Sequence, residues 1–290
     1  MGDPDATRPG GAKGAGDALP PYALVLSDID GTLLDPGHRL TDATRAAVRR
    51  VVGAGARFGL ATGRMPSGTT GIVEELGVPC ARICYSGAFV LDEHGDVVSS
   101  TTIDVGTAGA VLRVLHEGWP ELEPCFFAGW HWYVEHPDHP AVARETAIVR
   151  ARPERARLDE LLARGVAPNK IFCSRSAGIV SSSVRIAQEL RAAFPQLTVI
   201  RSSNGMMVEV VGARVSKATG ARALLERMGI PASGCLAFGD DENDVELLRM
   251  AGRGVAMANA AADVRRAADD VTASNADDGV ARYLLVHALP

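Results

Sequence analysis

The sequence predicts an α/β protein: a doubly wound parallel sheet with a smaller α+β domain inserted into it. Segments typical of strands and helices alternate near the N-terminus, and the same alternation returns after about residue 212. The stretch between them has a hairpin pattern and holds all three tryptophans. Because alternating β and α segments are typical of a parallel sheet with helices on its faces, the middle stretch is expected to be a separate domain.

The first part of the chain predicts a βαβαβ unit. A strand is expected over residues 22–26, because its apolar residues are continuous, as in a buried parallel strand. A helix follows Thr41, a residue suited to the N-cap, and two nearby glycines end it. The second strand is expected over 57–61, the second helix begins near Pro66, and the third strand covers 82–85.

After Gly87 the pattern changes to a hairpin, with apolar residues at 89–91 and 97–98 around a polar turn. The core pattern then resumes with a helix over 217–228, a strand over 235–238, a helix around 245–250, a strand over 254–257 and a last helix ending near Leu285. We therefore divide the chain into a flexible tail (1–20), a core (21–87 and 212–290) and an inserted domain (88–211).

Composition indicates a soluble globular protein in the cytoplasm. The chain has 290 residues, of which 47% are hydrophobic, which is enough for a large core. Its 30 basic residues against 35 acidic ones, without a basic cluster, disfavour nucleic-acid binding. No apolar stretch is long enough to cross a membrane, and no signal core precedes the fold. The five scattered cysteines are expected to be buried thiols. The protein is expected to be a monomer or a homodimer.

The most informative feature is the pair Asp28 and Asp30, on either side of Ile29 at the end of the first strand. If the chain stays extended, residues two apart point the same way, so both carboxylates converge at the carboxyl edge of the sheet. The repulsion between such like charges must be relieved, and a hard divalent cation with oxygen ligands is the usual means. A calcium loop is the competing interpretation, but Gly31 is fourth rather than sixth and Arg39 stands where the twelfth residue, Glu, is needed.

Three other polar groups stand where strands end or helices begin. They are Thr62-Gly63-Arg64 after the second strand, Lys217 at a helix start, and Asp240 to Asp244, including Asn243, after the strand over 235–238. Carboxylates suit Mg²⁺, whereas a threonine hydroxyl and a lysine ammonium suit phosphate oxygens. The sequence therefore predicts a site for a metal and a phosphate at this sheet edge.

This motif order resembles the haloacid dehalogenase superfamily of aspartate-nucleophile phosphatases. The matching residues are Asp28-Ile29-Asp30-Gly31-Thr32, Thr62, Lys217, Gly239-Asp240 and Asn243-Asp244. The position of the insert, and the segments 255–260 and 277–281, are similar to the Cof-type branch with a C2B cap. One departure is Ser86, where that branch usually has asparagine.

The resemblance implies a Mg²⁺-dependent phosphatase for a small phosphorylated metabolite, such as a sugar phosphate or a phosphorylated cofactor. Asp28 would be the nucleophile that forms an aspartyl-phosphate, and Asp30 the general acid and base. Mg²⁺ would be held by Asp28, Asp240 and the backbone carbonyl of Asp30. Asn243 and Asp244 would lie in the outer shell, with Asp244 orienting Lys217.

Substrate contacts are expected from the residues around the phosphoryl group: Thr62, Gly63, Arg64, Lys217 and Asn243. Thr62 and Lys217 would hold the phosphoryl oxygens, where charge spreads in the transition state. Arg64 is equally suited to an anionic substrate group or to a structural salt bridge. Two other functions remain open, namely a phosphomutase of the same fold and a non-catalytic sensor of a phosphometabolite.

Two features of the insert have competing interpretations. Its aromatic group is expected to form the core of the insert rather than line a substrate pocket, and consists of Phe126, Phe127, Trp130, Trp132 and Tyr133. Its histidines, His131, His136 and His139, are expected in an irregular loop, because prolines stand among them, rather than in a zinc site.

Overall fold

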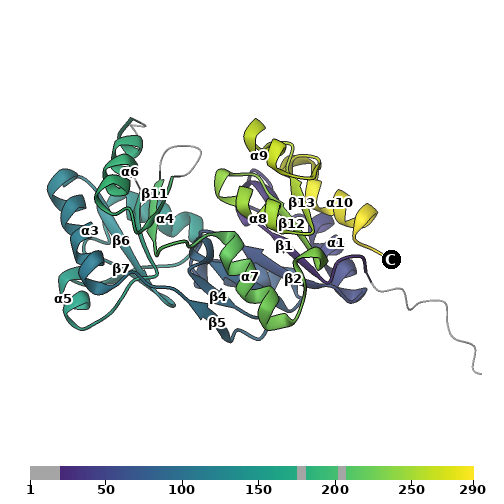
Figure 1. The fold of residues 1–290 in the computed structure, drawn as a ribbon, viewed down its shortest axis with the longest axis horizontal. Helices are drawn as coiled ribbons and strands as arrows, with labels where there is room; N and C mark the ends of the chain where they lie inside the picture. The colour runs from purple at the N-terminus through teal and green to yellow at the C-terminus, as the bar shows by residue number, and fades with distance from the viewer. Residues whose placement is uncertain (1–19, 175–180, 202–206) are drawn as a thin grey trace, which may run out of the picture.

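The computed structural model describes residues 20–174, 181–201 and 207–290. Residues 1–19 of the predicted tail lie outside this part. The described chain forms two sheets with helices packed against them (Figure 1). One sheet has eight strands and the other six, and the second is built from the middle of the chain. The predicted fold class, an α/β core with an inserted α+β part, is confirmed.

The eight-stranded sheet is parallel through six strands and ends in an antiparallel hairpin. Its order is β14 (Asp270–Val271), β13 (Arg253–Ala256), β12 (Cys235–Gly239), β1 (Leu24–Ser27), β2 (Arg57–Ala61), β3 (Cys80–Cys84), β4 (Phe89–Leu91) and β5 (Val97–Ser100). Two strands that are far apart in the sequence, β1 and β12, thus pair near the middle of the sheet. This central position puts the end of β1 in the middle of the sheet edge.

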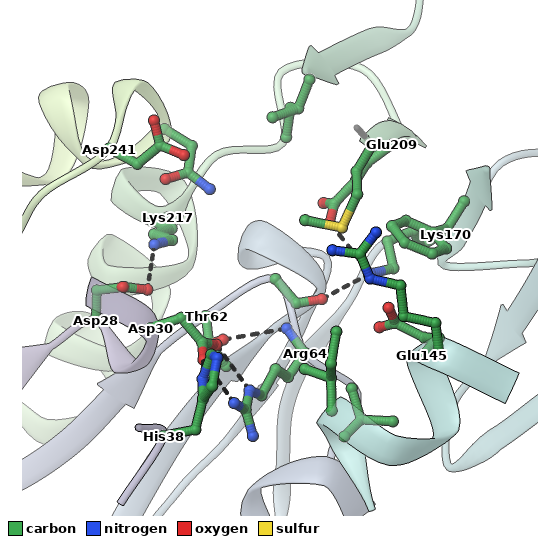
Figure 2. A pocket seen from close by; sticks show the side chains of 18 residues that line it. Asp28, Asp30, His38, Thr62, Arg64, Glu145, Lys170, Glu209, Lys217 and Asp241 are labelled. Atoms are coloured by element: carbon green, nitrogen blue, oxygen red, sulfur yellow. Dashed lines mark hydrogen bonds and ion pairs between the residues drawn. The ribbon is translucent and has the colours of Figure 1, made fainter. Parts of the chain in front are cut away.

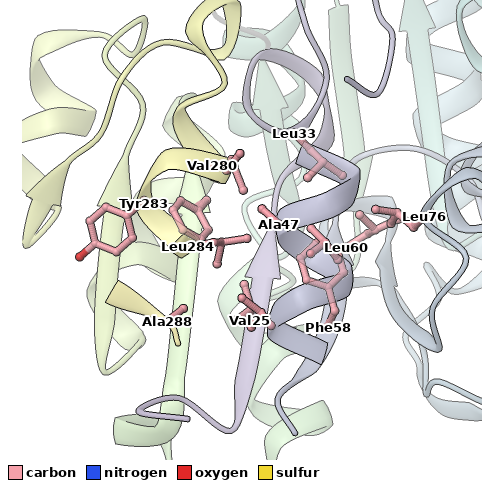
Figure 3. Packing of buried hydrophobic residues seen from close by; sticks show 14 of the residues in the cluster. Val25, Leu33, Ala47, Phe58, Leu60, Leu76, Val280, Tyr283, Leu284 and Ala288 are labelled. Carbon is pink, nitrogen blue, oxygen red and sulfur yellow. The ribbon is translucent and has the colours of Figure 1, made fainter. Parts of the chain in front are cut away.

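Helices cover both faces of this sheet, which explains why β1 is apolar throughout. They are α1 (Asp42–Gly53), α2 (Ser67–Leu76), α7 (Lys217–Met228), α8 (Val245–Met250), α9 (Ala262–Ala267) and α10 (Gly279–His287). Val25 packs on one face with Leu60 and Leu284 (Figure 3), whereas Leu24 and Leu26 pack on the other. Alternate residues of one strand therefore enter two hydrophobic cores.

The six-stranded sheet has the order β10 (Thr198–Arg201), β11 (Met207–Val211), β9 (Lys170–Ser174), β6 (Glu123–Ala128), β7 (His131–Val134) and β8 (Glu154–Arg155). Its helices are α3 (Val105–Gly118), α4 (Pro140–Val149), α5 (Leu158–Ala163) and α6 (Ser181–Ala193). In one hydrophobic cluster Phe127, Trp132 and Phe172 of this sheet pack with Phe89 of β4 and with Tyr85, which directly follows β3. In the described part of the chain, no helix is long and apolar enough to span a membrane.

Several predicted elements are confirmed to within a residue or two. Thr41 caps α1 and accepts a hydrogen bond from the Thr44 amide, and α7 covers the predicted residues. The helix α9 and the short strand β14 were not predicted. All five cysteines are buried, as expected. The hairpin β4–β5 pairs with β3, so it belongs to the eight-stranded sheet. The division of the chain into domains at residues 87 and 212 stays a prediction.

Candidate active site

Three neighbouring strands end at the same edge of the eight-stranded sheet, and predicted site residues follow each of them. Asp28 follows β1, Thr62 follows β2 and Asp240 follows β12. The three strands are parallel and adjacent, so their carboxyl ends lie side by side. Ligands of open α/β sheets bind at this edge. The topology therefore brings together residues that are far apart in the sequence.

The backbone turns sharply at the aspartate pair. β1 ends at Ser27, and Ile29–Leu33 form one wide turn in which Gly31 has a φ of +84°. A Cβ atom at this glycine would collide with the carboxylate of Asp240, so the turn requires glycine for its conformation and for space. The predicted extension through the pair thus ends early, because Ile29 already belongs to the turn.

Lys217 is a buried cation between two buried carboxylates. Its ammonium group donates to Asp28 at 2.6 Å and to Asp244 at 2.7 Å. Burial alone would lower the pKa of Lys217, but the charges of Asp244 and Asp28 outweigh it and raise the pKa. Ser216 caps the helix α7 at this point through a capping box with Thr219. Lys217 is therefore held in place and charged.

The acidic residues form one cluster at the sheet edge. Carboxylate oxygens of Asp28, Asp240 and Asp244 all lie within 4.8 Å of one another. Burial raises the pKa of Asp28, and it raises that of Asp240 to about 7 although Thr32 donates a hydrogen bond to Asp240. Asp244 also accepts hydrogen bonds from the amides of Asp240 and Asp241. A donor set of oxygens that repel one another fits a hard divalent cation.

Thr62 lies in a loop that is tied to both sheets. Its side-chain oxygen accepts a hydrogen bond from the Arg64 amide at 3.1 Å, and its carbonyl accepts one from the Ser86 amide at 2.9 Å. The next residue, Gly63, accepts a 2.7 Å hydrogen bond at its carbonyl from the ammonium group of Lys170 on β9. The loop after β2 is thus held by the eight-stranded sheet on one side and by the six-stranded sheet on the other.

Asp30 lies outside the acidic cluster and forms a bidentate pair with Arg64. The guanidinium group of Arg64 donates to the two carboxylate oxygens at 2.8 Å and 2.6 Å, and a ring nitrogen of His38 lies 3.1 Å from one of them. Burial acts to raise the pKa of Asp30, but the hydrogen bonds and charge of Arg64, with a contribution from His38, leave the pKa lowered. Of the two roles expected for Arg64, the structure displays a salt bridge.

A cavity of about 290 Å³ lies between the two sheets and contains most of the predicted residues. It is lined by Asp28, Asp30, Thr62, Gly63, Arg64, Lys217 and Asn243 among others, whereas Asp240 and Asp244 are not among its lining residues. The side-chain oxygen of Asn243 is buried and accepts no hydrogen bond from any described residue. Figure 2 shows Asp28 and Lys217 on one side of the cavity and Glu145, Lys170 and Glu209 on the other.

Comparison with known proteins identifies the family. A family model for haloacid dehalogenase-like hydrolases matches residues 25–284, which is most of the chain. The chain belongs to this family. A haloacid dehalogenase-like hydrolase of Bacteroides thetaiotaomicron has the same fold, with a TM-score of 0.81 and 24% identity over 91% of this chain and 98% of its own.

Two curated relatives of this haloacid dehalogenase-like hydrolase cover nearly its whole length. A protein of Haemophilus influenzae, named as a putative phosphatase, is 28% identical over 91% of this chain and 97% of its own. The 5-amino-6-(5-phospho-D-ribitylamino)uracil phosphatase YitU of Bacillus subtilis is 26% identical over 91% of this chain and 96% of its own.

The sequence did not predict the charged residues on the far side of the cavity of this hydrolase. We call these residues the cap wall; they are Arg144, Glu145, Lys170 and Glu209. Lys170 and Glu209 carry a signal in retrospect, because each is a charged residue in an otherwise apolar strand. The sequence gives no such signal for Arg144 and Glu145, because charged residues on a helix are usually solvated.

The aromatic residues of the insert mostly form its core, as expected. Phe126, Phe127 and Trp132 are buried, and none of the predicted aromatic group lines the cavity, whereas Trp130 is 44% exposed. The three histidines have separate surroundings: His131 pairs with Glu154, His136 pairs with Glu123, and His139 caps α4. In the described ranges, the acidic cluster is the one group whose ligand atoms are close enough for a metal.

Proposed function

We propose that the protein is a Mg²⁺-dependent phosphatase that hydrolyses a small phosphorylated metabolite, of the sugar phosphate or phosphorylated cofactor class. The observation that carries this proposal is the buried carboxylate of Asp28, 2.6 Å from the Lys217 ammonium group and within the acidic cluster. A carboxylate kept near a cation and open to a cavity is suited to attack phosphorus. The names of both curated relatives agree with this activity.

The chemistry takes two steps. In the first, an oxygen of Asp28 bonds to phosphorus in line with the leaving group, the bond from phosphorus to the leaving alcohol breaks, and Asp30 gives its proton to the leaving oxygen. In the second, Asp30 takes a proton from water, the water oxygen bonds to phosphorus, and the bond to Asp28 breaks. Thr62 and Lys217 stabilise the phosphoryl oxygens in both steps, with Gly63 and Asn243 beside them.

The surroundings of Asp30 favour its role as a base over its role as an acid. Its lowered pKa keeps it ionised, which suits the second step, where it accepts a proton. The first step needs a protonated Asp30, and the bidentate pair with Arg64 opposes protonation. We therefore propose that the pair with Arg64 loosens when substrate enters, and that Arg64 then faces the substrate.

The acidic cluster would hold Mg²⁺ through Asp28, Asp240 and the backbone carbonyl of Asp30. Asp244 and Asn243 would lie around the ion, because both oxygens of Asp244 already accept hydrogen bonds from Lys217 or from backbone amides. When bound, the ion would supply positive charge for the phosphoryl oxygens. It would also stabilise the ionised forms of Asp28 and Asp240, whose pKa values are raised mainly by burial and further by neighbouring carboxylates.

We also propose the setting in which this activity occurs. Residues 88–211 would act as a cap over the catalytic core, which comprises residues 21–87 and 212–290. The enzyme would act in the cytoplasm on small molecules, without nucleic-acid or membrane partners, because the chain lacks a basic cluster and long apolar stretches. It would work as a monomer or homodimer.

A phosphate-release screen over many phosphorylated metabolites, with and without Mg²⁺, tests the proposal. We expect phosphate release by the wild-type protein with Mg²⁺, and none after chelation or in Asp28→Asn. Isomerised substrate without free phosphate would identify a phosphomutase instead. Stabilisation by a phosphometabolite without turnover in any condition would identify a sensor.

A further inference from the structure

The cap wall faces the place where the proposed reaction puts its leaving group. Asp28 and Lys217, the proposed phosphoryl site, lie across the cavity from Glu145 and Glu209 (Figure 2). Asp28 attacks in line, so the leaving oxygen points away from it, toward the cavity and the cap wall. The cap wall therefore contacts the part of the substrate that differs between phosphomonoesters. This inference rests on the proposed function.

Most charged groups of the cap wall already have partners in the protein. Lys170 donates to the Gly63 carbonyl, lies 3.4 Å from Glu209, and faces three aromatic rings at 4.9 to 5.5 Å. Glu209 accepts a hydrogen bond from the hydroxyl of Ser86 at 3.1 Å. Arg144 also takes part in an interaction within the protein. These groups mainly hold the cavity together.

Glu145 differs from its neighbours, because no hydrogen bond reaches its carboxylate from any of the residues that the structure describes. It stands in the middle of α4, and apolar side chains such as Phe172 and Met207 also line the cavity there. Burial raises the pKa of Glu145; the charges of Lys170 and Arg64 oppose this, and those of Glu209 and Asp30 add to it. A largely buried carboxylate without a donor is unfavourable unless a ligand supplies one.

The cavity limits what that ligand is. Its volume of about 290 Å³ is at the lower end of the range for small-molecule sites, about 300–1,000 Å³. The phosphoryl group takes up part of this space on the side of Asp28 and Thr62. The remainder accommodates a leaving group about the size of a monosaccharide, with a polar end toward Glu145.

We propose that Glu145 determines substrate specificity by accepting a hydrogen bond from a hydroxyl or amino group on the leaving group of the substrate. It selects substrates with such a donor at the end away from phosphorus. Substrates without a donor there leave the carboxylate unpaired, and substrates with a carboxylate there are repelled. Glu145 takes no part in bond making or breaking.

The test compares two substrates in three variants. The first substrate is the hydroxylated phosphomonoester that the wild-type protein hydrolyses best, and the second is phenyl phosphate, which has no donor on its leaving group. For Glu145→Ala we expect kcat/KM on the hydroxylated substrate to fall about 10- to 100-fold, because a hydrogen bond to a charged group is lost. The loss should appear mainly in KM, and kcat/KM on phenyl phosphate should change less than about twofold.

Two further variants separate recognition from folding. Glu145→Gln keeps an acceptor oxygen, so we expect a smaller loss than in Glu145→Ala on the same hydroxylated substrate. Glu117→Ala removes an exposed carboxylate of α3 that does not line the cavity, and should leave both substrates unaffected. If Glu145→Ala does not fold, the test uses Glu145→Gln instead. The proposal then requires kcat/KM to fall more on the hydroxylated substrate than on phenyl phosphate in this variant.

Three results would overturn the proposal. One is an unchanged ratio of kcat/KM between the two substrates in the Glu145 variants, whether both values fall together or neither falls. Another is a preference of the wild-type protein for phenyl phosphate over every hydroxylated or aminated phosphomonoester. The third, an absence of hydrolysis of any phosphomonoester by the wild-type protein, rejects the proposed function as well. The first two occur only in an active phosphatase, so the two failures are distinguishable.

Discussion

The ammonium group of Lys170, on a strand of the six-stranded sheet, donates a 2.7 Å hydrogen bond to the carbonyl oxygen of Gly63, in the loop after β2 of the eight-stranded sheet. The lysine side chain is only 5% exposed. Gly63 directly follows Thr62, which we propose to hold a phosphoryl oxygen. One buried cation thus connects the cap wall to the loop that we propose to bind phosphate.

Lys170→Met is expected to weaken substrate binding. The change leaves the Gly63 carbonyl without its charged donor, and a hydrogen bond to a charged group is worth about 1.5–3 kcal/mol, so KM should rise about tenfold or more. Steady-state kinetics on the best substrate measures this. The control is Arg164→Gln, which removes a positive charge at an exposed position directly after α5. An unchanged KM in Lys170→Met would show that the Gly63 loop holds its position without the lysine.

Arg64→Met is expected to move the acidic limb of the pH profile of kcat to higher pH. Arg64 lowers the pKa of Asp30, so removing Arg64 raises that pKa. Asp30 must be ionised to accept a proton from water, and with a raised pKa it becomes ionised only at higher pH. His38→Asn should shift the limb in the same direction but by less. A limb that stays in place, or moves to lower pH, would contradict the assignment of Asp30 as the base.

Asp28→Asn is expected to be the more severe of the two substitutions in the aspartate pair. It removes the covalent route, whereas loss of general acid and base help in Asp30→Asn typically reduces the rate by about 10²- to 10⁴-fold. Turnover of the best substrate by both purified variants, with Mg²⁺ present, provides the comparison. Wild-type turnover in Asp28→Asn would reject the nucleophile.

Lys217→Met is expected to destabilise the protein as well as abolish activity. The substitution leaves Asp28 and Asp244 buried without their shared cation, and breaking a buried pair in this way costs about 3–5 kcal/mol. The free energy of unfolding from urea denaturation measures the loss. Adding Mg²⁺ should restore part of it, because the ion also neutralises the cluster. A stability equal to that of the wild-type protein would mean that water reaches these carboxylates.

Affinity for Mg²⁺ is expected to rise with pH through the neutral range. The pKa of Asp240 is raised to about 7, so below that pH a proton competes with the metal, and above it the carboxylate is free to bind. Calorimetry between about pH 6 and about pH 8 should show tighter binding and less proton release at the higher pH. Asp240→Asn should bind Mg²⁺ more weakly and with a smaller dependence on pH, and the dependence that remains is expected from Asp28, whose pKa is also raised.

Without metal, the same raised pKa predicts how stability depends on pH. Folded Asp240 holds its proton up to about pH 7, whereas the unfolded residue loses it near its ordinary value of 3.8. The folded state therefore binds more protons in this window, so the contribution of Asp240 to stability falls as pH rises through it. Comparing urea denaturation of the wild-type protein with Asp240→Asn isolates this contribution. A wild-type stability that rises relative to the variant over this window would contradict the burial of a protonated Asp240.

The core was predictable because its local signals agree with its tertiary structure. The continuous apolar run of β1 is required by two hydrophobic cores, and Thr41 caps a helix through its own side chain. Residues at strand ends meet because parallel strands share an edge, so Asp28, Thr62 and Asp240 come together by topology alone.

The cap wall was not predictable, because its residues meet only in the folded protein. Glu145 comes from a helix, and Lys170 and Glu209 come from two antiparallel strands, β9 and β11, whose pairing the sequence pattern does not reveal. The pairing of Asp30 with Arg64 depends on the wide turn after β1, which a strand pattern does not reveal. Ser86, the departure from the family pattern, binds Glu209, a contact across the two sheets.

The pairing of β1 with β12 sets the order in which the protein can mature on the ribosome. β1 is made long before its neighbour β12, which ends at Gly239, and Leu24 pairs with Cys235. Until that segment emerges, the nascent sheet has an open edge on an apolar strand, which is prone to association with other chains. The proposed catalytic site is therefore assembled only after β12 has been made, so we expect a nascent polypeptide that lacks β12 to be inactive and to depend on protection of this edge.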